Sequence, residues 1–149
     1  MIIKNANPDD HIILTGLVKK SKAFWGYPPS IMKKWDNDLT ISSDYILKNV
    51  VCKLIFNNTI VGCYSFIKKS SKLVELDFFF ILPAYIGKGL GTFMMNDLFK
   101  RLKLNNIEII KVISDPNAEN FYKKFGFTTI QKKESLIEGR FLPNMEKYL

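Results

Sequence analysis

The sequence predicts one mixed α/β domain, in which helices flank a mostly antiparallel sheet. Its 149 residues contain no internal repeat or linker, and 47% of them are hydrophobic, which suits a single domain with a sizeable core. Runs rich in β-branched and aromatic residues alternate with segments whose apolar residues have helical spacing. These observations predict a sheet with helices packed against it.

The first half of the chain predicts helices followed by a strand hairpin. The expected elements are a strand over 2–6, a helix from 8 to about 24, a short helix over 31–35, a helix capped by the run Ser42-Ser43-Asp44 that ends near 48, and strands over 50–56 and 59–68. Asn57 and Asn58 form the turn of the hairpin, which would place Cys52 opposite Cys63. The apolar positions expected on the first helix are Ile12, Ile13, Leu17 and Val18.

The second half of the chain predicts a buried central strand, then alternating helices and strands. The expected elements are a strand over 73–82, a helix over 92–104, a strand over 107–114, a short helix over 118–125 that Gly126 ends, and strands over 128–135 and 141–149. The strand over 73–82 is almost continuously apolar, so both faces should be buried. Its exceptions, Glu75 and Asp77, share one face because side chains alternate with a period of two. The apolar stripe expected on the following helix is Phe93, Met94, Leu98, Phe99 and Leu102.

A glycine-rich loop joins the central strand to the helix that follows. Residues 82–92 read Leu-Pro-Ala-Tyr-Ile-Gly-Lys-Gly-Leu-Gly-Thr, with Gly87, Gly89 and Gly91 at alternate positions. Glycine permits backbone dihedrals that other residues avoid and lets a ligand approach the main chain. The N–H groups that open a helix have no intrahelical acceptor and lie at the positive end of its dipole, so the loop is expected to bind a phosphate or pyrophosphate. Its spacing fits neither a Walker loop nor a Rossmann fingerprint.

Composition and charge restrict the class of protein. No segment is apolar for the length that a membrane span requires, and the start resembles a strand rather than a signal peptide, so a cytoplasmic protein without membrane contact is expected. The formal net charge of +8 permits a nucleic-acid partner, but the lysines are scattered and no nucleic-acid motif is present. A basic chain also suits a ligand with several phosphate charges. The two cysteines, expected as small buried hydrophobes, and His11 lack metal-site spacing, so no metal is predicted.

Two segments resemble the GNAT family of N-acetyltransferases. Gly89, Leu90 and Gly91 occupy the last three positions of that family's acetyl-coenzyme A loop, Gln/Arg-x-x-Gly-x-Gly/Ala, although Ile86 stands where Gln or Arg is usual. Residues 115–127, Asp-Pro-Asn-Ala-Glu-Asn-Phe-Tyr-Lys-Lys-Phe-Gly-Phe, resemble the family's second conserved segment, about thirty residues further on. The order of the expected elements is also similar to the GNAT fold, which has splayed central strands, over nearly the whole chain.

The resemblance implies an N-acetyltransferase that uses acetyl-coenzyme A, and it assigns roles in the cofactor site. Main-chain groups of Ile81 and Leu82 would pair with the pantetheine arm, which Asn117 would also bond. Tyr122 would lie near the thioester sulfur. The loop residues that would hold the pyrophosphate are Gly87, Lys88, Gly89, Leu90, Gly91 and Thr92. Two alternatives stay open: Asn117 caps the short helix, and Tyr122 is a core aromatic.

Two carboxylates and a tyrosine are candidates for the proton transfers. A primary amine has a pKa of about 10.4, so its attack on a thioester requires a base. Glu75 is the first candidate base and Asp77 the second, while an ion pair with a lysine or arginine is the alternative role for either. A backbone N–H would hold the oxyanion, and Tyr122 would supply a proton to the departing thiolate. Trp25 and Tyr27 are expected to line the acceptor pocket or to form a core or lid contact.

The predicted function is transfer of acetyl from acetyl-coenzyme A to a primary amine of a small molecule or protein, by direct attack in a ternary complex. A non-catalytic acetyl-coenzyme A sensor is the alternative, against which Tyr122 and an acidic residue on the central strand argue. A nucleic-acid-binding protein is a further alternative that depends on charge. The acceptor is not identified, since one fold serves many substrates, and both a monomer and a homodimer are compatible with the sequence.

Overall fold

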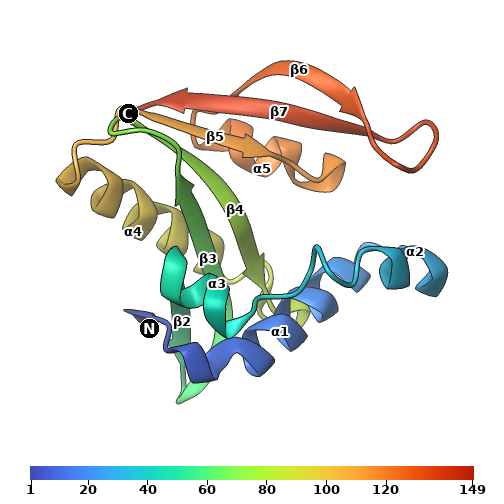
Figure 1. Ribbon diagram of the computed structural model, residues 1–149, viewed down its shortest axis with the longest axis horizontal. Helices are drawn as coiled ribbons and strands as arrows, with labels where there is room; N and C mark the ends of the chain where they lie inside the picture. Colours follow the sequence, from blue (N-terminus) through green and yellow to red (C-terminus); the bar gives the residue numbers. More distant parts are fainter. The chain divides into compact units, whose positions relative to one another are not determined.

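Seven strands form a hydrogen-bonded sheet in the order β1-β2-β3-β4-β5-β7-β6 in the computed structural model, which describes all 149 residues (Figure 1). The strands are β1 (Ile2–Asn5), β2 (Val50–Phe56), β3 (Thr59–Lys68), β4 (Leu73–Ile81), β5 (Ile109–Ile113), β6 (Thr128–Glu134) and β7 (Phe141–Tyr148). The helices are α1 (His11–Ala23), α2 (Pro29–Lys34), α3 (Ser43–Lys48), α4 (Leu90–Leu104) and α5 (Glu119–Lys124), with 3₁₀ turns η1 (Pro8–Asp10), η2 (Pro83–Tyr85) and η3 (Pro116–Ala118). Strands β4 and β5 pair in parallel, whereas β1 with β2, β2 with β3, β5 with β7 and β6 with β7 pair antiparallel. The predicted mixed, mostly antiparallel sheet is confirmed.

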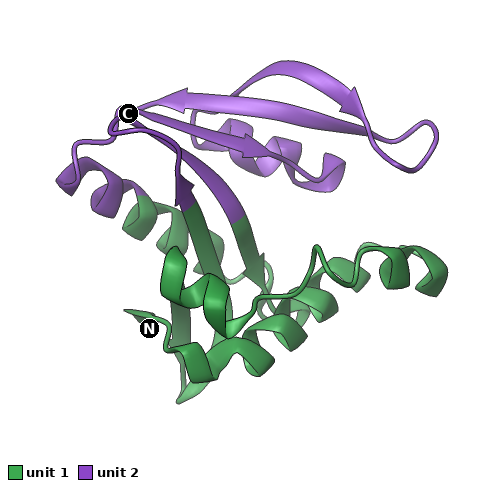
Figure 2. Cartoon of the chain, in the orientation of Figure 1, with its two compact units in different colours: residues 1–66, 78–98 green, residues 67–77, 99–149 purple.

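The chain divides into two compact units, which Figure 2 colours separately. Unit 1 contains residues 1–66 and 78–98, and unit 2 contains residues 67–77 and 99–149. Strands β3 and β4 and helix α4 continue from one unit into the other. The candidate site residues are therefore distributed over both units.

Local chemistry explains why several elements of unit 1 have their predicted bounds. Strands β2 and β3 begin and end as predicted, and φ is positive at Asn57 (50°) and Asn58 (61°), as a two-residue type I′ turn requires. The side chain of Ser42 accepts a hydrogen bond from the backbone N–H of Tyr45 at 3.0 Å and so caps α3.

The two cysteines are buried and free, but they do not face each other as predicted. A bulge between Leu54 and Ile55 shifts the register of the hairpin, so Cys52 pairs with Tyr64 and Cys63 pairs with Lys53. Burial, and to a smaller extent neighbouring Cys52, raises the pKa of the Cys63 thiol to about 12, so this thiol stays protonated at neutral pH.

Only some of the apolar positions of α1 are buried. Leu14, Leu17 and Val18 are at most 3% exposed, whereas Ile12 and Ile13 are 72% and 56% exposed. A helix of this kind can turn only one stripe toward the core, and the stripe that includes Leu14 buries three apolar residues. Of the four apolar positions expected on this helix, Leu17 and Val18 are therefore in the core, whereas Ile12 and Ile13 are not.

Helix α4 also buries a different stripe from the one expected. Its fully buried residues are Met94, Met95, Leu98 and Leu102. Phe93, which was expected among them, is 38% exposed, so that part of the prediction is wrong. The helix begins at Leu90 rather than at Thr92, because the glycine loop ends sooner than the sequence indicated.

Unit 2 contains the parallel pair of β4 and β5, with β7 beside β5 and β6 beside β7. Helix α5 ends as predicted at Gly126, which has a φ of +89°. The N–H of Gly126 bonds the carbonyl of Lys123 at 3.0 Å, and the N–H of Phe127 bonds the carbonyl of Tyr122 at 3.2 Å, which is the Schellman pattern of helix ends.

Some predicted bounds are wrong by a few residues, mostly where a proline intervenes. Strand β4 ends at Ile81, before the 3₁₀ turn that starts at Pro83. The turn η3 precedes α5, so this helix begins at Glu119 rather than at Ala118. Helix α2 begins at Pro29, because proline suits the first helical position. None of the helices is both long enough and apolar enough to cross a membrane.

Candidate functional site

The glycine loop has the backbone conformation for which its glycines are needed. The φ angle is +79° at Gly87 and +81° at Gly89, a region that other L-residues rarely adopt. A Cβ atom built on either residue would meet no heavy atom within 4 Å. The space around these two residues is therefore open, as a main-chain ligand site requires. Ile86, the departure from the family pattern, is 45% exposed.

Three N–H groups at the start of α4 precede the first hydrogen bond of the helix. That bond joins the N–H of Phe93 to the carbonyl of Gly89, at 3.1 Å. The N–H groups of Leu90, Gly91 and Thr92 therefore have no acceptor within the helix. The positive end of the dipole of this 15-residue helix lies behind them. This arrangement can bind an anion without any basic side chain.

The main chain at the end of β4 is already partly bonded within unit 1. The N–H of Leu82 donates to the carbonyl of Val61 at 2.8 Å, and the carbonyl of Leu82 accepts from the N–H of Tyr85 at 2.9 Å. The carbonyl of Ile81 accepts from the hydroxyl of Ser21 at 2.8 Å. The carbonyls of Ile81 and Leu82 each retain a second lone pair that can accept a hydrogen bond from a ligand, whereas the N–H of Leu82 is already used in its bond to Val61.

Glu75 and Asp77 lie on the part of β4 that belongs to unit 2. The ammonium of Lys69 is 3.4 Å from Glu75 Oε2, and the Glu75 side chain is 33% exposed. The ion pair that was the alternative for Glu75 is therefore present. A pair this accessible contributes only about 0–1 kcal/mol, so a ligand can displace Lys69 at small cost. Asp77 is exposed and follows at the next position on the same face.

Glu75 lines a hollow of about 360 Å³ in unit 2. The row formed by Glu75 on β4, Lys111 on β5 and Glu146 on β7 is in register across three strands. The charged groups of this lining are the carboxylates of Glu75 and Glu146 and the ammonium of Lys111, so a positively charged guest that displaces Lys69 from Glu75 would find a carboxylate partner. Ile113 and Ile130, which are 54% and 58% exposed, add apolar surface. The lining is not a metal site, because no group of three or more His, Cys, Asp or Glu side chains is arranged to hold a metal ion.

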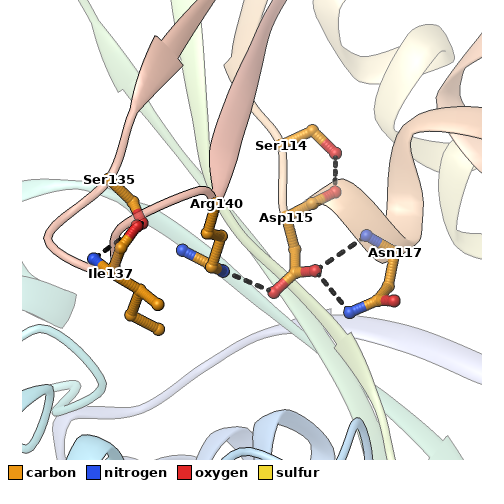
Figure 3. A network of polar contacts seen from close by, with 6 residues as sticks. All are labelled: Ser114, Asp115, Asn117, Ser135, Ile137 and Arg140. Carbon is orange, nitrogen blue, oxygen red and sulfur yellow. Dashed lines mark hydrogen bonds and ion pairs between the residues drawn. The ribbon is translucent and has the colours of Figure 1, made fainter.

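A polar network holds Asn117 at the start of η3 (Figure 3). Asp115 Oδ1 accepts hydrogen bonds from Asn117 N at 2.8 Å and from Asn117 Nδ2 at 2.9 Å. Asp115 Oδ2 accepts from Arg140 Nη2 at 3.0 Å. The Asp115 side chain thus caps η3, and no side chain caps α5, so the alternative in which Asn117 is the cap is wrong.

Tyr122 lies on α5 with only 6% of its surface exposed. Its ring contacts those of Phe121 and Phe127, with centroid distances of 5.4 and 5.3 Å. Burial raises the pKa of Tyr122, and the charge of Asp115 raises it further. The ring packs in the core of unit 2, and the hydroxyl holds its proton at neutral pH.

Trp25 and Tyr27 follow α1 in unit 1. Trp25 is 44% exposed and contacts Phe24 edge-on at 5.3 Å, so it is not a core residue. Tyr27 contacts Trp35 edge-on at 4.8 Å. The ammonium of Lys22 lies 5.5 Å from the Tyr27 ring and 5.1 Å from the Trp35 ring, within cation–π range of both.

Sequence reasoning missed three of these residues. Asp115 had a local signal, since an acidic residue before Pro116 at the start of a short helix is a common cap. Arg140 had none, because its partner lies 25 residues away along the chain. Trp35 was assigned only to a helix, and its contact with Lys22 depends on how two helices of unit 1 pack.

The sequence matches a model of the acetyltransferase (GNAT) domain family over residues 44–149. An uncharacterised N-acetyltransferase of Gracilaria tenuistipitata var. liui is 41% identical over 49 residues. That stretch covers 33% of this chain and 27% of the relative, so the chain matches about a quarter of the relative's length.

Among the solved structures that share the fold are two with coenzyme A or acetyl-CoA bound. The PaiA N-acetyltransferase of Thermoplasma acidophilum, in complex with coenzyme A, has a TM-score of 0.80, 18% identity and 100% coverage of both chains. A GNAT family acetyltransferase of Elizabethkingia anophelis with acetyl-CoA bound has a TM-score of 0.68 and 14% identity, and the match covers 99% of this chain and 97% of that protein's chain. At these identities the likeness concerns the fold and not the substrate.

Proposed function

This chain belongs to the GNAT family of acetyltransferases, and from that premise we propose that it transfers acetyl from acetyl-coenzyme A to a primary amine of a small molecule or protein. The amine attacks directly while both ligands are bound. The observation that carries the proposal is the start of α4, where an open glycine loop precedes three N–H groups without helical acceptors. Such a site suits a pyrophosphate.

The pyrophosphate is assigned to the loop. The residues that would hold it are Gly87, Lys88, Gly89, Leu90, Gly91 and Thr92. The positive φ angles of Gly87 and Gly89 support this role, as does the ammonium of Lys88, which is on an exposed residue. Because most of the donors are main-chain N–H groups, Ile86 in place of the usual Gln or Arg leaves the mechanism intact.

Two residues of unit 2 and the end of β4 are assigned to the arm that carries the acetyl group. Asn117 would bond the arm through its amide, and Tyr122 would donate its hydroxyl proton toward the sulfur. The carbonyls of Ile81 and Leu82 would accept hydrogen bonds with their second lone pairs. Bound acetyl-coenzyme A would supply an acetyl group that its thioester activates toward a neutral amine.

Glu75 is assigned as the base that takes a proton from the acceptor amine. Its carboxylate lines the hollow and is 33% exposed, so an amine in the hollow can reach it by displacing Lys69. Asp77, two residues further along the same face, is the second candidate.

The acceptor is assigned to surfaces that suit a cationic molecule with an apolar part. The hollow offers two carboxylates beside Ile113 and Ile130. Trp25, with an exposed ring, and Tyr27 are further proposed contacts of the acceptor. We also propose that both units act as one GNAT domain, because the family match over residues 44–149 includes parts of each.

Release of free coenzyme A thiol tests the proposal. The purified chain is incubated with acetyl-coenzyme A and each member of a panel of amines, amino acids, aminoglycosides and peptides, and mass spectrometry identifies the acetylated product. Thiol release that requires an amine is the expected result. Binding of acetyl-coenzyme A in calorimetry without amine-dependent release would favour the sensor alternative, and absence of binding would refute both.

A further inference from the structure

Arg140 is held by main-chain bonds at the end of the connection between β6 and β7. Its N–H donates to the carbonyl of Ile137 at 3.1 Å, and its carbonyl accepts from the N–H of Ser135 at 2.7 Å. The connection is further closed by the hydroxyl of Ser135, which accepts from the N–H of Ile137 at 3.1 Å (Figure 3). The backbone from which the Arg140 side chain extends is therefore held in place by hydrogen bonds.

The guanidinium of Arg140 and the carboxylate of Asp115 form an ion pair that is largely shielded from solvent. Nη2 of Arg140 is 3.0 Å from Oδ2 of Asp115, and their side chains are 12% and 11% exposed. A carboxylate so far removed from water needs a cationic partner, and a planar guanidinium also restricts its rotation. Arg140 thus determines which way the two Asp115 oxygens point.

The other oxygen of Asp115 determines the orientation of the Asn117 amide. Oδ1 of Asp115 accepts from both N and Nδ2 of Asn117, at 2.8 and 2.9 Å. An ionised carboxylate only accepts hydrogen bonds, so the end of the amide that faces it must be the NH₂ group. The opposite end of the amide is then the carbonyl oxygen, which is an acceptor.

We propose that Arg140 is a positioning residue for cofactor binding. By holding Asp115 it orients Asn117, so that Asn117 Oδ1 accepts a hydrogen bond from an amide N–H of the pantetheine arm. This inference rests on the proposed function, in which Asn117 contacts the cofactor. It extends the site to a residue on the β6–β7 connection, which no motif in the sequence marks.

The test is a thermodynamic cycle on coenzyme A affinity, measured by calorimetry in the absence of an acceptor. Arg140→Gln and Asn117→Ala are each expected to raise the dissociation constant about tenfold or more. Asn117→Ala removes the proposed hydrogen bond to the cofactor, and Arg140→Gln removes the charged partner of Asp115, which orients Asn117. If Arg140 acts through Asn117, Arg140→Gln has no further effect in the Asn117→Ala background. Lys133→Gln, which removes an exposed cation from the same hairpin, is the control and should bind as the wild type does.

Arg140→Lys separates positioning from folding. It keeps the charge but loses the planar fork, so an intermediate dissociation constant is expected in the wild-type background and no effect in the Asn117→Ala background. If Arg140→Gln does not fold, as judged by circular dichroism, this variant decides the matter. In steady-state assays, the folded Arg140 variants should have a higher KM for acetyl-coenzyme A than the wild type and an unchanged KM for the amine.

Three results would overturn the inference. One is a wild-type dissociation constant in every folded Arg140 variant, and another is an equal effect of these variants in both backgrounds. The third is wild-type affinity in Asn117→Ala, which would also remove Asn117 from the proposed cofactor site. Amine-dependent thiol release by the wild-type chain would still decide the proposed transferase activity separately.

Discussion

Replacement of Gly89 by aspartate tests the anion site at the start of α4. The backbone there has a φ of +81°, which aspartate and asparagine tolerate better than most residues. A Cβ would meet no heavy atom within 4 Å, so either side chain fits without a clash. The left-handed conformation costs roughly 1–2 kcal/mol in both variants, so both should fold, with similar melting temperatures.

The two variants differ only in one negative charge, so their comparison isolates electrostatics. At about 5 Å from one phosphate charge, Coulomb's law gives roughly 1 kcal/mol in water and roughly 3 kcal/mol at an effective dielectric constant of 20. The dissociation constant of coenzyme A should therefore be roughly 5-fold to 150-fold higher for Gly89→Asp than for Gly89→Asn. The new carboxylate would also compete for the N–H groups of Leu90, Gly91 and Thr92, which acts in the same direction.

Calorimetric titrations with coenzyme A at low and high salt provide the measurement. The difference between the variants should shrink as salt rises, because the screening length falls from about 10 Å at 0.1 M to about 3 Å at 1 M. Equal affinities of the aspartate and asparagine variants at low salt would refute the reasoning, since no anion would then lie near residue 89.

Glu75→Gln should lower kcat and flatten the rise of kcat with pH. Glu108→Gln, which breaks the exposed ion pair with Lys72, is the control. An unchanged pH profile of kcat in Glu75→Gln would assign the role of base to Asp77 or to water instead. Tyr122→Phe should lower kcat roughly 10²-fold without changing coenzyme A affinity, and wild-type kcat would reduce Tyr122 to a packing residue. Lys53→Met should cost about 1–3 kcal/mol of stability at pH 7, because Lys53 is 2.7 Å from Asp10 and the two side chains are 12% and 15% exposed. Burial raises the pKa of Asp10, but hydrogen bonds from Lys53 and Asn7 outweigh burial, so the pKa is lowered in the folded protein and the stabilisation is present above about pH 4 and lost below it. In urea unfolding, the free energies of unfolding of the wild type and the variant should therefore converge at about pH 3. A difference between them that stays constant with pH would contradict this explanation.

Short-range chemistry in the sequence determined the order of the elements and several of their ends. The Asn57-Asn58 turn, the Ser42 cap and the Gly126 helix end all follow from residues close together in the chain, and all are present. The glycine loop between β4 and α4 was predicted for the same reason. Its positive φ angles at Gly87 and Gly89 are a local property of those residues.

Packing and long-range pairing decided what the sequence left open. A bulge moved Cys52 opposite Tyr64, and the choice of buried stripe left Ile12 and Ile13 exposed. Arg140 reached Asp115 across 25 residues of chain, and strand register made Glu75 line a hollow. The physical reason is common to these cases. Turns and caps are short-range interactions of neighbouring residues, whereas the register of strands, the phase of a helix and the partner of a charge depend on which distant surfaces bury each other.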